Sequence, residues 1–389
     1  MIDRCKSCIY PVNHPLGLVI NSEGICSGCT LHFEKNNIDW ELRFDKLQKL
    51  VDQYKSNKGN YDCIVPVSGG QDSFYIVHTI VNRLGLNPIL VNFNRNFNSK
   101  IGLANLAKLK TSFDVDFRQQ TINPALARRI VRTSAINIGS INWLWIAGQT
   151  SFPLRVAESL GIPLIIWGAH QGMEQVGMFS HYDEVEMSRR YRLEHDLMGV
   201  DEEGITSFDT DFSKLDLSMI QYPSDAAIDQ HGIRGIYLGN YIRWDPVQQH
   251  SFVRKSYGYL GAVESRSYYA FDNPDCDVYN NYQDLLKVAR VGYGKVTDQL
   301  TRDIRHGRIS RSQALRLEKK YLGKSCLGLK DFADWLGTTV DFLRILLRKH
   351  DNNIFSLMLE KEFKNYGINL SKNSEDQYDT PYQNFGKGL

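Results

Sequence analysis

Apolar and polar positions follow two alternating periods between residue 60 and about residue 245. Short apolar runs bounded by turn residues predict buried strands at 64–67, in "NPILVNF" (87–93) and in "GIPLIIWGAH" (161–170). Two more strands are predicted in "DVDFRQQ" and "GIRGIYLGNYI", and helices are predicted at 73–84, 101–110 and 123–160. Strands that alternate with helices predict an α/β fold, with a doubly wound parallel sheet covered by helices on both faces.

The segments on either side of this alternation have other patterns. Residues 1–36 are rich in turn residues and look like a small separate knob, and a helix with one apolar face is predicted at 38–55. From residue 279 onward the periodicity is helical, and the last residues are polar and expected to be loose. The predicted organisation is a knob, a linking helix, an α/β domain, a helical region and a tail, at 1–36, 37–58, 59–275, 276–368 and 369–389.

Composition narrows the class of protein only slightly. Of the 389 residues, 42% are hydrophobic and 23% are charged, which is ordinary for a globular protein. A net charge of +2 argues against a broad basic surface for nucleic acid. No apolar run is long enough to cross a bilayer and the first residues have no signal-peptide core, so a cytoplasmic location is expected.

The stretch "VSGGQDS" (67–73) is the first candidate functional motif, because it joins a buried strand to a helix. Two glycines allow a tight turn and bring bare backbone N–H groups close to a ligand, and the helix N-terminus adds partial positive charge. Ser68 and Ser73 add hydroxyl donors, whereas Asp72 suits Mg²⁺ or a helix cap. The sequence therefore predicts a phosphate site at the carboxyl end of the first strand.

S-G-G-x-D-S after an apolar strand resembles the PP-loop of the N-type ATP pyrophosphatases, whereas the Walker A pattern is absent. The resemblance implies that 59–275 is an ATP-binding domain in which Ser68, Gly69, Gly70, Asp72 and Ser73 hold the pyrophosphate of ATP. It also implies that Mg²⁺ offsets the developing charge, and that adenine lies across neighbouring strand ends.

The strand ends supply further candidates by the same resemblance. Asn92 and Phe93 end the second strand, and Gly168 ends the fourth and is expected to let the nucleotide pass close to the backbone. Glu174 follows Gly168 and is a candidate Mg²⁺ ligand together with Asp72, although an acid on a surface loop explains it equally well.

Four of the seven cysteines lie in the first 29 residues, as Cys5-x-x-Cys8 and Cys26-x-x-Cys29. Two such pairs separated by seventeen residues have the spacing of a four-cysteine structural zinc site. An iron–sulfur cluster and free thiols are the alternatives. The other cysteines, Cys63, Cys276 and Cys326, are isolated and are expected to be buried thiols. Residues 24–28, "GICSG", match the G-x-C-x-G elbow of class I glutaminases, but they lie in the glycine-rich knob beside Cys29, so metal binding is favoured and no catalytic cysteine for glutamine hydrolysis is apparent.

The order of a four-cysteine knob, a PP-loop domain and a helical region resembles the N-acetyl sugar amidotransferases of surface-polysaccharide and LPS biosynthesis. The run "VARVGYGKVTDQLTRDIRHGRISRSQAL" supports the resemblance, which spans Cys5 to about residue 365. It implies an AMP- and pyrophosphate-forming C–N ligase that turns a sugar N-acetyl group into an acetamidino group. Ammonia would come from a separate glutaminase similar to the amidotransferase half of imidazole glycerol phosphate synthase, with a cyclase-like barrel partner.

Residues of the helical region are candidates for contact with the sugar or the transferred phosphate. Lys295, Asp298 and Arg302 would share one face of a helix, preceded by Tyr293. With Asp72, Lys295 and Arg302 are the predicted catalytic residues, although a solvated helix face is the commoner meaning of such a pattern.

Two other functions remain open at the level of sequence. One is a PP-loop tRNA-modifying enzyme of the lysidine synthetase or thiolation type, and the other is a zinc-knob scaffold with a vestigial nucleotide site. The sugar also stays open between a UDP-linked diacetamido uronic acid and a nonulosonic acid.

Overall fold

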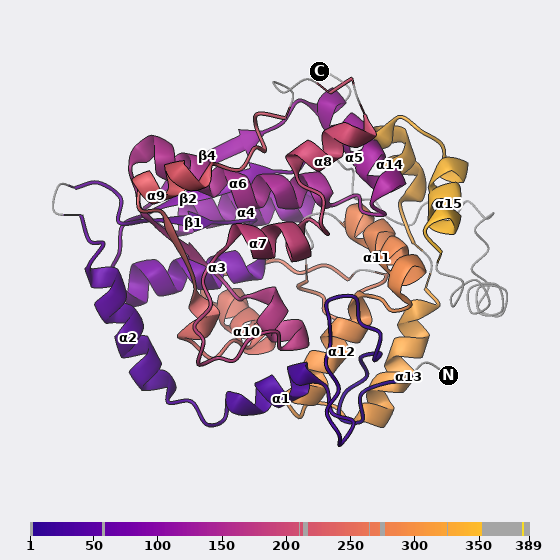
Figure 1. Ribbon diagram of the computed structural model, residues 1–389, viewed down its shortest axis with the longest axis horizontal. Coiled ribbons are helices and arrows are strands. Elements are labelled where there is room, and N and C mark those ends of the chain that lie inside the picture. Colours follow the sequence, from indigo (N-terminus) through magenta and orange to yellow (C-terminus); the bar gives the residue numbers. More distant parts are fainter. Residues whose placement is uncertain are drawn as a thin grey trace.

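A five-stranded parallel sheet forms the centre of the computed structural model (Figure 1), which describes residues 3–56, 59–209, 211–212, 217–263, 265–272, 277–324, 326–351 and 383–384. The strands are β1 (Cys63–Pro66), β2 (Pro88–Asn94), β4 (Asp116–Thr121), β5 (Leu164–Trp167) and β6 (Arg234–Tyr237). Their order is β4-β2-β1-β5-β6, and each neighbouring pair is parallel. The chain adds strands first on one side of β1 and then on the other, so the crevice between β1 and β5 is the switch point where open sheets bind ligands.

Fifteen α-helices are found among the described residues. They are α1 (Ser27–Glu34), α2 (Trp40–Asp52), α3 (Gln71–His78), α4 (Lys100–Ser112), α5 (Pro124–Asn137), α6 (Trp143–Leu160), α7 (Arg189–Tyr191), α8 (Glu202–Phe208), α9 (Asp225–Gln230), α10 (Pro246–Tyr257), α11 (Asp277–Val291), α12 (Lys295–Arg305), α13 (Arg311–Leu322), α14 (Leu329–Leu336) and α15 (Val340–Lys349). Short turns of π- or 3₁₀-helix are η1 (Thr79–Arg83), η2 (Gly172–Val176), η3 (Arg192–Asp196) and η4 (Leu238–Asn240). A two-stranded pairing joins β3 (Phe97–Asn98) to β7 (Gln383–Asn384).

Alternating side chains of the strands build two cores, one on each face of the sheet. On one face, Ile64, Val91 and Ile165 pack with α5, α6 and the helices of the C-terminal region. On the other face, Val65 and Leu90 pack with α2, α3, α4 and α10. The period of two along each buried strand explains this division, and it confirms the doubly wound fold predicted from the sequence.

The predicted boundaries of the first helices are close to the observed ones. Helix α2 begins at Trp40 because the Asp39 side chain accepts hydrogen bonds from the backbone N–H groups of Glu41 and Leu42. Helix α3 begins at Gln71, two residues before the predicted start, and thereby places Asp72 in its first turn. The helix therefore starts inside the glycine loop rather than after it.

The N-terminal knob packs against the rest of the chain and is not the separate unit expected from its sequence. Its cysteines and Tyr10 share one apolar cluster with Val176 of η2 and with Tyr293. Arg311 of α13 donates from Nε to the carbonyl oxygens of Cys5 and Cys8 at 3.2 and 2.9 Å, and Figure 1 shows the knob beside α12 and α13. A segment this short cannot bury enough apolar surface by itself, so it shares its core with its neighbours.

No helix in the described part of the chain has both the length and the apolar character needed to span a membrane.

Candidate functional site

The glycine loop after β1 is held in a fixed conformation by its own hydroxyl groups. The Ser73 Oγ accepts a hydrogen bond from the Ser68 backbone N–H at 2.9 Å, and the Ser68 Oγ accepts one from the Gly70 N–H at 3.2 Å. Gly69 has φ +87°, and a Cβ added there would lie 3.1 Å from the Cβ of Leu106. This position therefore needs glycine both for its backbone conformation and for its close approach to α4. Gly70 is the N-cap of α3, so the N-terminus of that helix opens at the loop.

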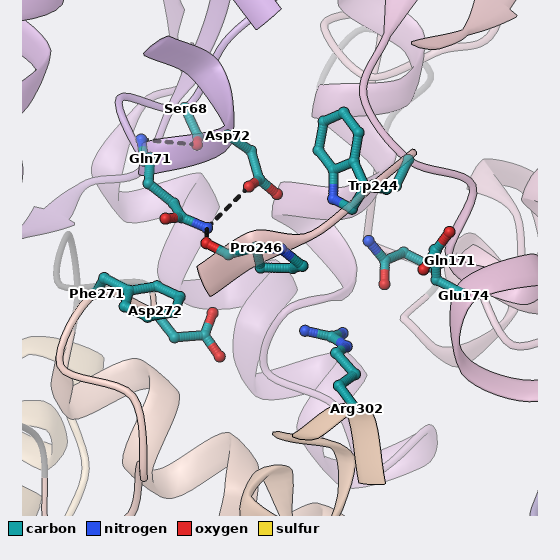
Figure 2. Close-up of a pocket in the computed structure, with 12 residues that line it drawn as sticks. Ser68, Gln71, Asp72, Gln171, Glu174, Trp244, Pro246, Phe271, Asp272 and Arg302 are labelled. Carbon is teal, nitrogen blue, oxygen red and sulfur yellow. Dashed lines mark hydrogen bonds between the residues drawn. The ribbon is translucent and has the colours of Figure 1, made fainter. Parts of the chain in front are cut away.

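A pocket of about 590 Å³ lies in front of this loop. Its walls come from the loop, from η2, from the segment between β6 and α10, and from the C-terminal region (Figure 2). The lining residues are Ser68, Gly70, Gln71, Asp72, Ala169, Gln171, Glu174, Trp244, Pro246, Phe271, Asp272 and Arg302. The pocket is therefore a shared one, built by the PP-loop and by residues some 200 positions further along the chain.

Three carboxylates, those of Asp72, Glu174 and Asp272, and the guanidinium of Arg302 line this pocket. The pKa of Asp72 is raised to about 6, first by burial of the carboxyl group and then by the negative charge of Asp272. Burial alone would lower the pKa of Arg302, but the charge of Asp272 outweighs it and keeps the guanidinium charged. Within the described residues, no hydrogen bond or ion pair engages the Arg302 side chain. Its donors are thus available to an anion in the pocket.

Glu174 also lines the pocket, but its charge is already matched. Lys35, just beyond α1, places its Nζ at 2.6 and 2.8 Å from the two carboxylate oxygens, with 2% and 12% of the two side chains exposed. Burial favours the neutral acid, yet Lys35 holds the pKa of Glu174 below its usual value. Both oxygens of this predicted Mg²⁺ ligand are therefore occupied by an ammonium group.

A second pocket, of about 1210 Å³, continues from the first into the C-terminal region. The two pockets share Asp72, Gln171, Asp272 and Arg302. Six carboxamide side chains line the second pocket, namely Asn142, Gln171, Gln175, Asn280, Gln283 and Gln299. Lys287 forms a short ion pair with Asp298 there, and Lys295 lies 3.7 Å from Asp272. The walls combine neutral donors and acceptors with a few charges of both signs, as suits a polar ligand rich in hydroxyl and amide groups.

The structure brings together many of the residues predicted from the sequence. Ser68, Gly70, Asp72, Glu174 and Arg302 line one pocket, with Gly69 and Ser73 forming the loop behind them. Lys295 and Asp298 line the second pocket with Arg302. Helix α12 is buried along most of its length, so the alternative of a solvated helix face is wrong.

Three predicted nucleotide-binding residues do not line the first pocket. Asn92 is buried and donates from Nδ2 to the Val67 carbonyl at 2.7 Å, which ties β2 to the loop. Phe93 is 3% exposed and packs against Gly148, where a Cβ would lie 2.3 Å from its ring. At Gly168 a Cβ would lie 2.9 Å from Ile76 Cδ1, so close packing of side chains explains this glycine. Tyr293, too, is turned toward the knob, where its hydroxyl meets His14 Nε2 at 2.5 Å.

Sequence reasoning missed Lys35, Trp244 and Asp272. Trp244 and Pro246 follow β6 at the carboxyl edge of the sheet, so strand position was a usable signal for them. Lys35 and Asp272 lie in irregular segments without a motif, and only the fold brings them to the pocket.

The four N-terminal cysteines form one cluster. Their Sγ atoms all lie within 4.8 Å of one another, and the residues are at most 1% exposed. Four sulfurs around a single ion with Zn–S bonds would be about 3.8 Å apart, and the Sγ atoms of Cys8 and Cys26 are separated by 3.6 Å. The Cys5 sulfur accepts from the backbone N–H groups of Cys8 and Cys26 at 3.4 and 3.2 Å. The donor set therefore fits one tetrahedral metal ion.

Arg305 connects this cluster with the pocket. Its Nη2 lies 3.7 Å from Cys26 Sγ, and its Nη1 donates to the Glu174 carbonyl at 2.8 Å. A Cβ at Gly28 would lie 2.2 Å from Nη2, so only glycine leaves room for this guanidinium beside the cysteines. The positive charge offsets part of the negative charge that four thiolates give to a divalent ion.

A doubly wound parallel sheet with S-G-G-x-D-S at its switch point and a pocket in front of it defines a PP-loop protein of the N-type ATP pyrophosphatase superfamily. Residues 265–378 match the family described as "LPS biosynthesis protein WbpG-like, C-terminal domain". This match is confined to the C-terminal region, and it agrees with the resemblance to surface-polysaccharide enzymes seen in the sequence.

Among curated proteins, the chain is 26% identical over 119 residues to the protein MJ1599 of Methanocaldococcus jannaschii. That match covers 29% of this chain and 40% of the relative, so it spans less than half of the relative's length.

Among solved structures, the NH3-dependent NAD synthetase of Campylobacter jejuni is 14% identical, with a TM-score of 0.30, over 55% of this chain and 96% of that one. The U34-tRNA thiolase NcsA of Methanococcus maripaludis with its [4Fe-4S] cluster is 10% identical, with a TM-score of 0.26, over 82% and 88% of the two chains. TM-scores of this size carry no argument about mechanism, which has to come from the pocket itself.

Proposed function

We propose that the protein is an ATP-dependent amidotransferase that converts a sugar N-acetyl group into an acetamidino group. The observation that supports this most is the continuity of the two pockets, which share Asp72, Gln171, Asp272 and Arg302. A phosphate-binding loop that opens directly into a carboxamide-lined cavity places an activating nucleotide next to a polar substrate. This arrangement suits transfer of AMP to an oxygen of that substrate.

The first pocket would take the phosphates of ATP. Backbone N–H groups at the start of α3 and the hydroxyl of Ser68 suit the β- and γ-phosphates, and Arg302 faces them from α12. Mg²⁺, held by carboxylates of this pocket, would supply charge neutralisation for the departing pyrophosphate.

The second pocket would take the sugar. Each carboxamide both donates and accepts hydrogen bonds. Gln299 is already engaged by Tyr268, Ser267 and Asp272, so the other carboxamides of the wall would match the hydroxyl and acetamido groups of a sugar. Lys295 and Arg302, at the junction of the pockets, would attract a carboxylate or a phosphate on the same substrate. An acidic or nucleotide-linked N-acetyl sugar fits both features.

The reaction has two steps. The acetamido oxygen attacks the α-phosphorus of ATP and displaces pyrophosphate, and loss of the amide proton leaves an O-adenyl imidate. Ammonia then adds to the imidate carbon, and the C–O bond breaks to release AMP, so that the oxygen of the amide is replaced by nitrogen. AMP is a much better leaving group than the oxygen of a resonance-stabilised amide, so one hard step becomes two easier ones. Water must be kept from the imidate, because hydrolysis would return the amide.

Ammonia would come from a separate glutaminase, similar to the amidotransferase half of imidazole glycerol phosphate synthase with its cyclase-like barrel partner. Four of the described cysteines are committed to the cluster, and Cys63 is fully buried in the sheet. Cys276 lies outside the described residues. These placements support a division of labour in which this chain activates the sugar and the partner releases ammonia.

The cysteine cluster would hold one zinc ion with a structural role. The short separations between the sulfurs suit a single ion, whereas an iron–sulfur cluster distributes its thiolates over several irons and spaces them further apart. Four protein ligands leave no open position, so chemistry at this metal is not part of the proposal.

The test is a direct assay with purified protein, ATP, Mg²⁺ and an ammonium salt as the nitrogen source. The substrates are a UDP-linked diacetamido uronic acid and a diacetamido nonulosonic acid. We expect equal amounts of AMP and of a product about one mass unit lighter than its substrate, since oxygen is exchanged for an NH group. Arg302→Met should abolish both products, whereas the exposed Asp341→Asn should leave them unchanged. AMP without an amidine product, from every sugar offered, would overturn the proposal.

A further inference from the structure

A third pocket, of about 550 Å³, lies at the carboxyl ends of β5 and β6 and has no role in the proposed reaction. Aromatic rings make up much of its lining, namely those of Trp167, Tyr191, Tyr222 and Tyr237. Gln171 lines this pocket and both of the others, and Ala169 lines this one and the first. The three pockets therefore meet, and a ligand held by the aromatic rings can extend into either neighbour.

Asp196, the last residue of η3, brings a carboxyl group to this pocket. Arg192 lines the pocket too, but its Nε donates to Thr150 Oγ1 at 2.8 Å and its Nη2 pairs with Glu202. Within the described residues, no hydrogen bond or ion pair engages the Asp196 carboxyl group. Burial raises its pKa to about 7, and burial followed by the charge of Asp196 raises the pKa of Tyr237. The carboxyl group thus lies close to the tyrosines with its oxygens available to a ligand.

The tyrosine rings are held in place by neighbouring side chains. The ring of His170 lies 4.2 Å from that of Tyr191 and 4.8 Å from that of Tyr237, measured between centroids. The guanidinium groups of Arg189 and Arg192 each lie 4.6 Å from the centre of the Tyr222 ring. A pocket whose rings are already fixed loses little conformational entropy when a ligand binds.

Hydroxyl groups supply further polar contacts. In the part of the chain that the structure describes, no group engages the hydroxyls of Tyr222 or Tyr237. The Tyr191 hydroxyl accepts from the Gly172 N–H at 3.0 Å, so its own proton is available for a second bond. Together with Asp196, these hydroxyls place donors and acceptors beside the aromatic surfaces.

Flat rings with a few polar groups at their edges suit a planar heterocycle. A nucleobase stacks on aromatic side chains and is fixed by hydrogen bonds along its polar edge. An N–H or amino group of the base can donate to Asp196, and a carbonyl oxygen or ring nitrogen can accept from a tyrosine hydroxyl. A sugar ring needs polar partners on most of its rim, and the carboxamide-lined second pocket suits it better.

The adenine of ATP has an apolar surface elsewhere. Trp244, Pro246 and Phe271 line the first pocket in front of the glycine loop, so ATP does not need the third pocket for its base. A base in the third pocket would then belong to a second nucleotide.

We propose that Asp196 and the aromatic rings of the third pocket bind the nucleobase of a nucleotide-linked sugar, whose sugar lies in the second pocket. The phosphates between base and sugar would pass Gln171, where the pockets meet. This inference rests on the proposed function for the presence of a sugar, and it narrows the substrate to the nucleotide-linked class.

The test is calorimetry on the full-length protein, titrated with UDP and, as alternative bases, with GDP, CDP and dTDP, with and without saturating Mg·ATP. At least one diphosphate should bind, and Mg·ATP should leave its affinity unchanged, because the two bases occupy different pockets. Asp196→Ala should weaken this binding by about ten-fold or more without weakening ATP binding. Since the wild-type carboxyl group is buried without a partner, Asp196→Ala should not lower the melting temperature. Glu194→Ala is the matched control on the same turn, because its side chain is 48% exposed, and it should bind the diphosphate as the wild type does.

Two variants of Tyr237 test the stacking. Tyr237→Leu keeps apolar bulk but removes the ring, and it should weaken diphosphate binding by about ten-fold or more. Tyr237→Phe restores the ring and should recover most of the lost affinity. Equal binding by the Leu and Phe variants would contradict a stacked base.

Two results would overturn the proposal as a whole. One is that none of the diphosphates binds. The other is that ATP displaces the diphosphate or binds more weakly to Asp196→Ala, since the pocket would then hold adenine. Amidine formation from a free nonulosonic acid without diphosphate binding overturns only this inference. Diphosphate binding without amidine formation from any sugar overturns only the proposed function.

Discussion

Lys35 and Glu174 form a buried ion pair that joins the N-terminal knob to the pocket in front of the glycine loop. The Nζ of Lys35 lies 2.6 and 2.8 Å from the two oxygens of Glu174, although the residues are 139 positions apart in the sequence. Because Lys35 neutralises Glu174, η2 places an acid on the wall of this pocket without adding net negative charge there.

Lys35→Met should destabilise the protein strongly, because it leaves the Glu174 carboxylate buried without a partner. The expected loss in the free energy of unfolding is about 3–5 kcal/mol, measured by denaturant titration. Lys46→Met is the matched control, because the Lys46 side chain is 57% exposed in its pair with Glu184. The control should cost less than about 1 kcal/mol. Equal effects of the two variants would contradict the role given to Lys35.

Gly69→Ala should weaken ATP binding by about ten-fold or more, because about 1–3 kcal/mol of backbone strain and a contact with Leu106 would displace the loop. The control is Gly161→Ala, at the C-cap of α6, which also has positive φ (+65°) but has nothing within 4 Å of an added Cβ. Calorimetry with ATP should show weaker binding for the first variant only. Wild-type affinity in Gly69→Ala would mean that the loop does not bind the phosphates.

The raised pKa of Asp72 predicts a pH effect with a definite sign. The folded state binds the Asp72 proton with a pKa of about 6, against an ordinary value of 3.8. The contribution of Asp72 to the stability of the nucleotide-free protein is therefore fully present below pH 4 and is lost as the pH rises through 6. Asp72→Asn should raise the free energy of unfolding at pH 7 by on the order of 1 kcal/mol and should flatten the pH dependence between 4 and 6. Thermal melts of the wild type and of Asp72→Asn between pH 4 and 7 would measure both effects. A variant that is less stable than the wild type at pH 7 would contradict the prediction.

Removing the metal from the cysteine cluster should loosen the pocket as well as the knob. We expect about one zinc per chain by elemental analysis and no visible absorption of an iron–sulfur centre. Cys26→Ser, which also removes the sulfur beside Arg305, should lose the metal and lower the melting temperature. Cys326→Ser is the control, since Cys326 lies far along the chain in the C-terminal region and outside the cluster. Full metal content in Cys26→Ser would contradict the four-cysteine site.

The sheet was predictable from sequence because local pattern and fold agree there. The buried strands β1, β2 and β5 are short apolar runs that end in turn residues. Even β4, an edge strand with mostly exposed residues, is predictable because it lies between two helical patterns. The glycine loop is equally predictable from the sequence, because its conformation depends on residues that are adjacent in the chain.

The rest of the site depends on contacts between distant segments, which periodicity does not encode. Phe93 ends a strand at the edge where ligands bind, yet the two-residue alternation turns its ring toward Gly148 and into the core. Asp272 follows an irregular stretch without any motif, yet it reaches the pocket because Lys295 and Gln299 hold it. Similarly, the roles of Arg302 and Arg305 depend on the pocket and the cysteine cluster that lie next to α12, and the sequence of the helix itself shows neither.

Arg302 and Arg305 are one turn apart on α12, and Arg302 lines the pocket in front of the glycine loop whereas Arg305 lies beside the cysteine cluster. In the proposed enzyme, this one helix would present a guanidinium to the nucleotide and another to the metal, and the two occupancies would then be interdependent. If the metal increases the affinity for nucleotide by some factor, thermodynamic reciprocity requires that the nucleotide increases the affinity for the metal by the same factor. Where the metal is scarce, chains with nucleotide bound would thus retain it longer than chains without nucleotide.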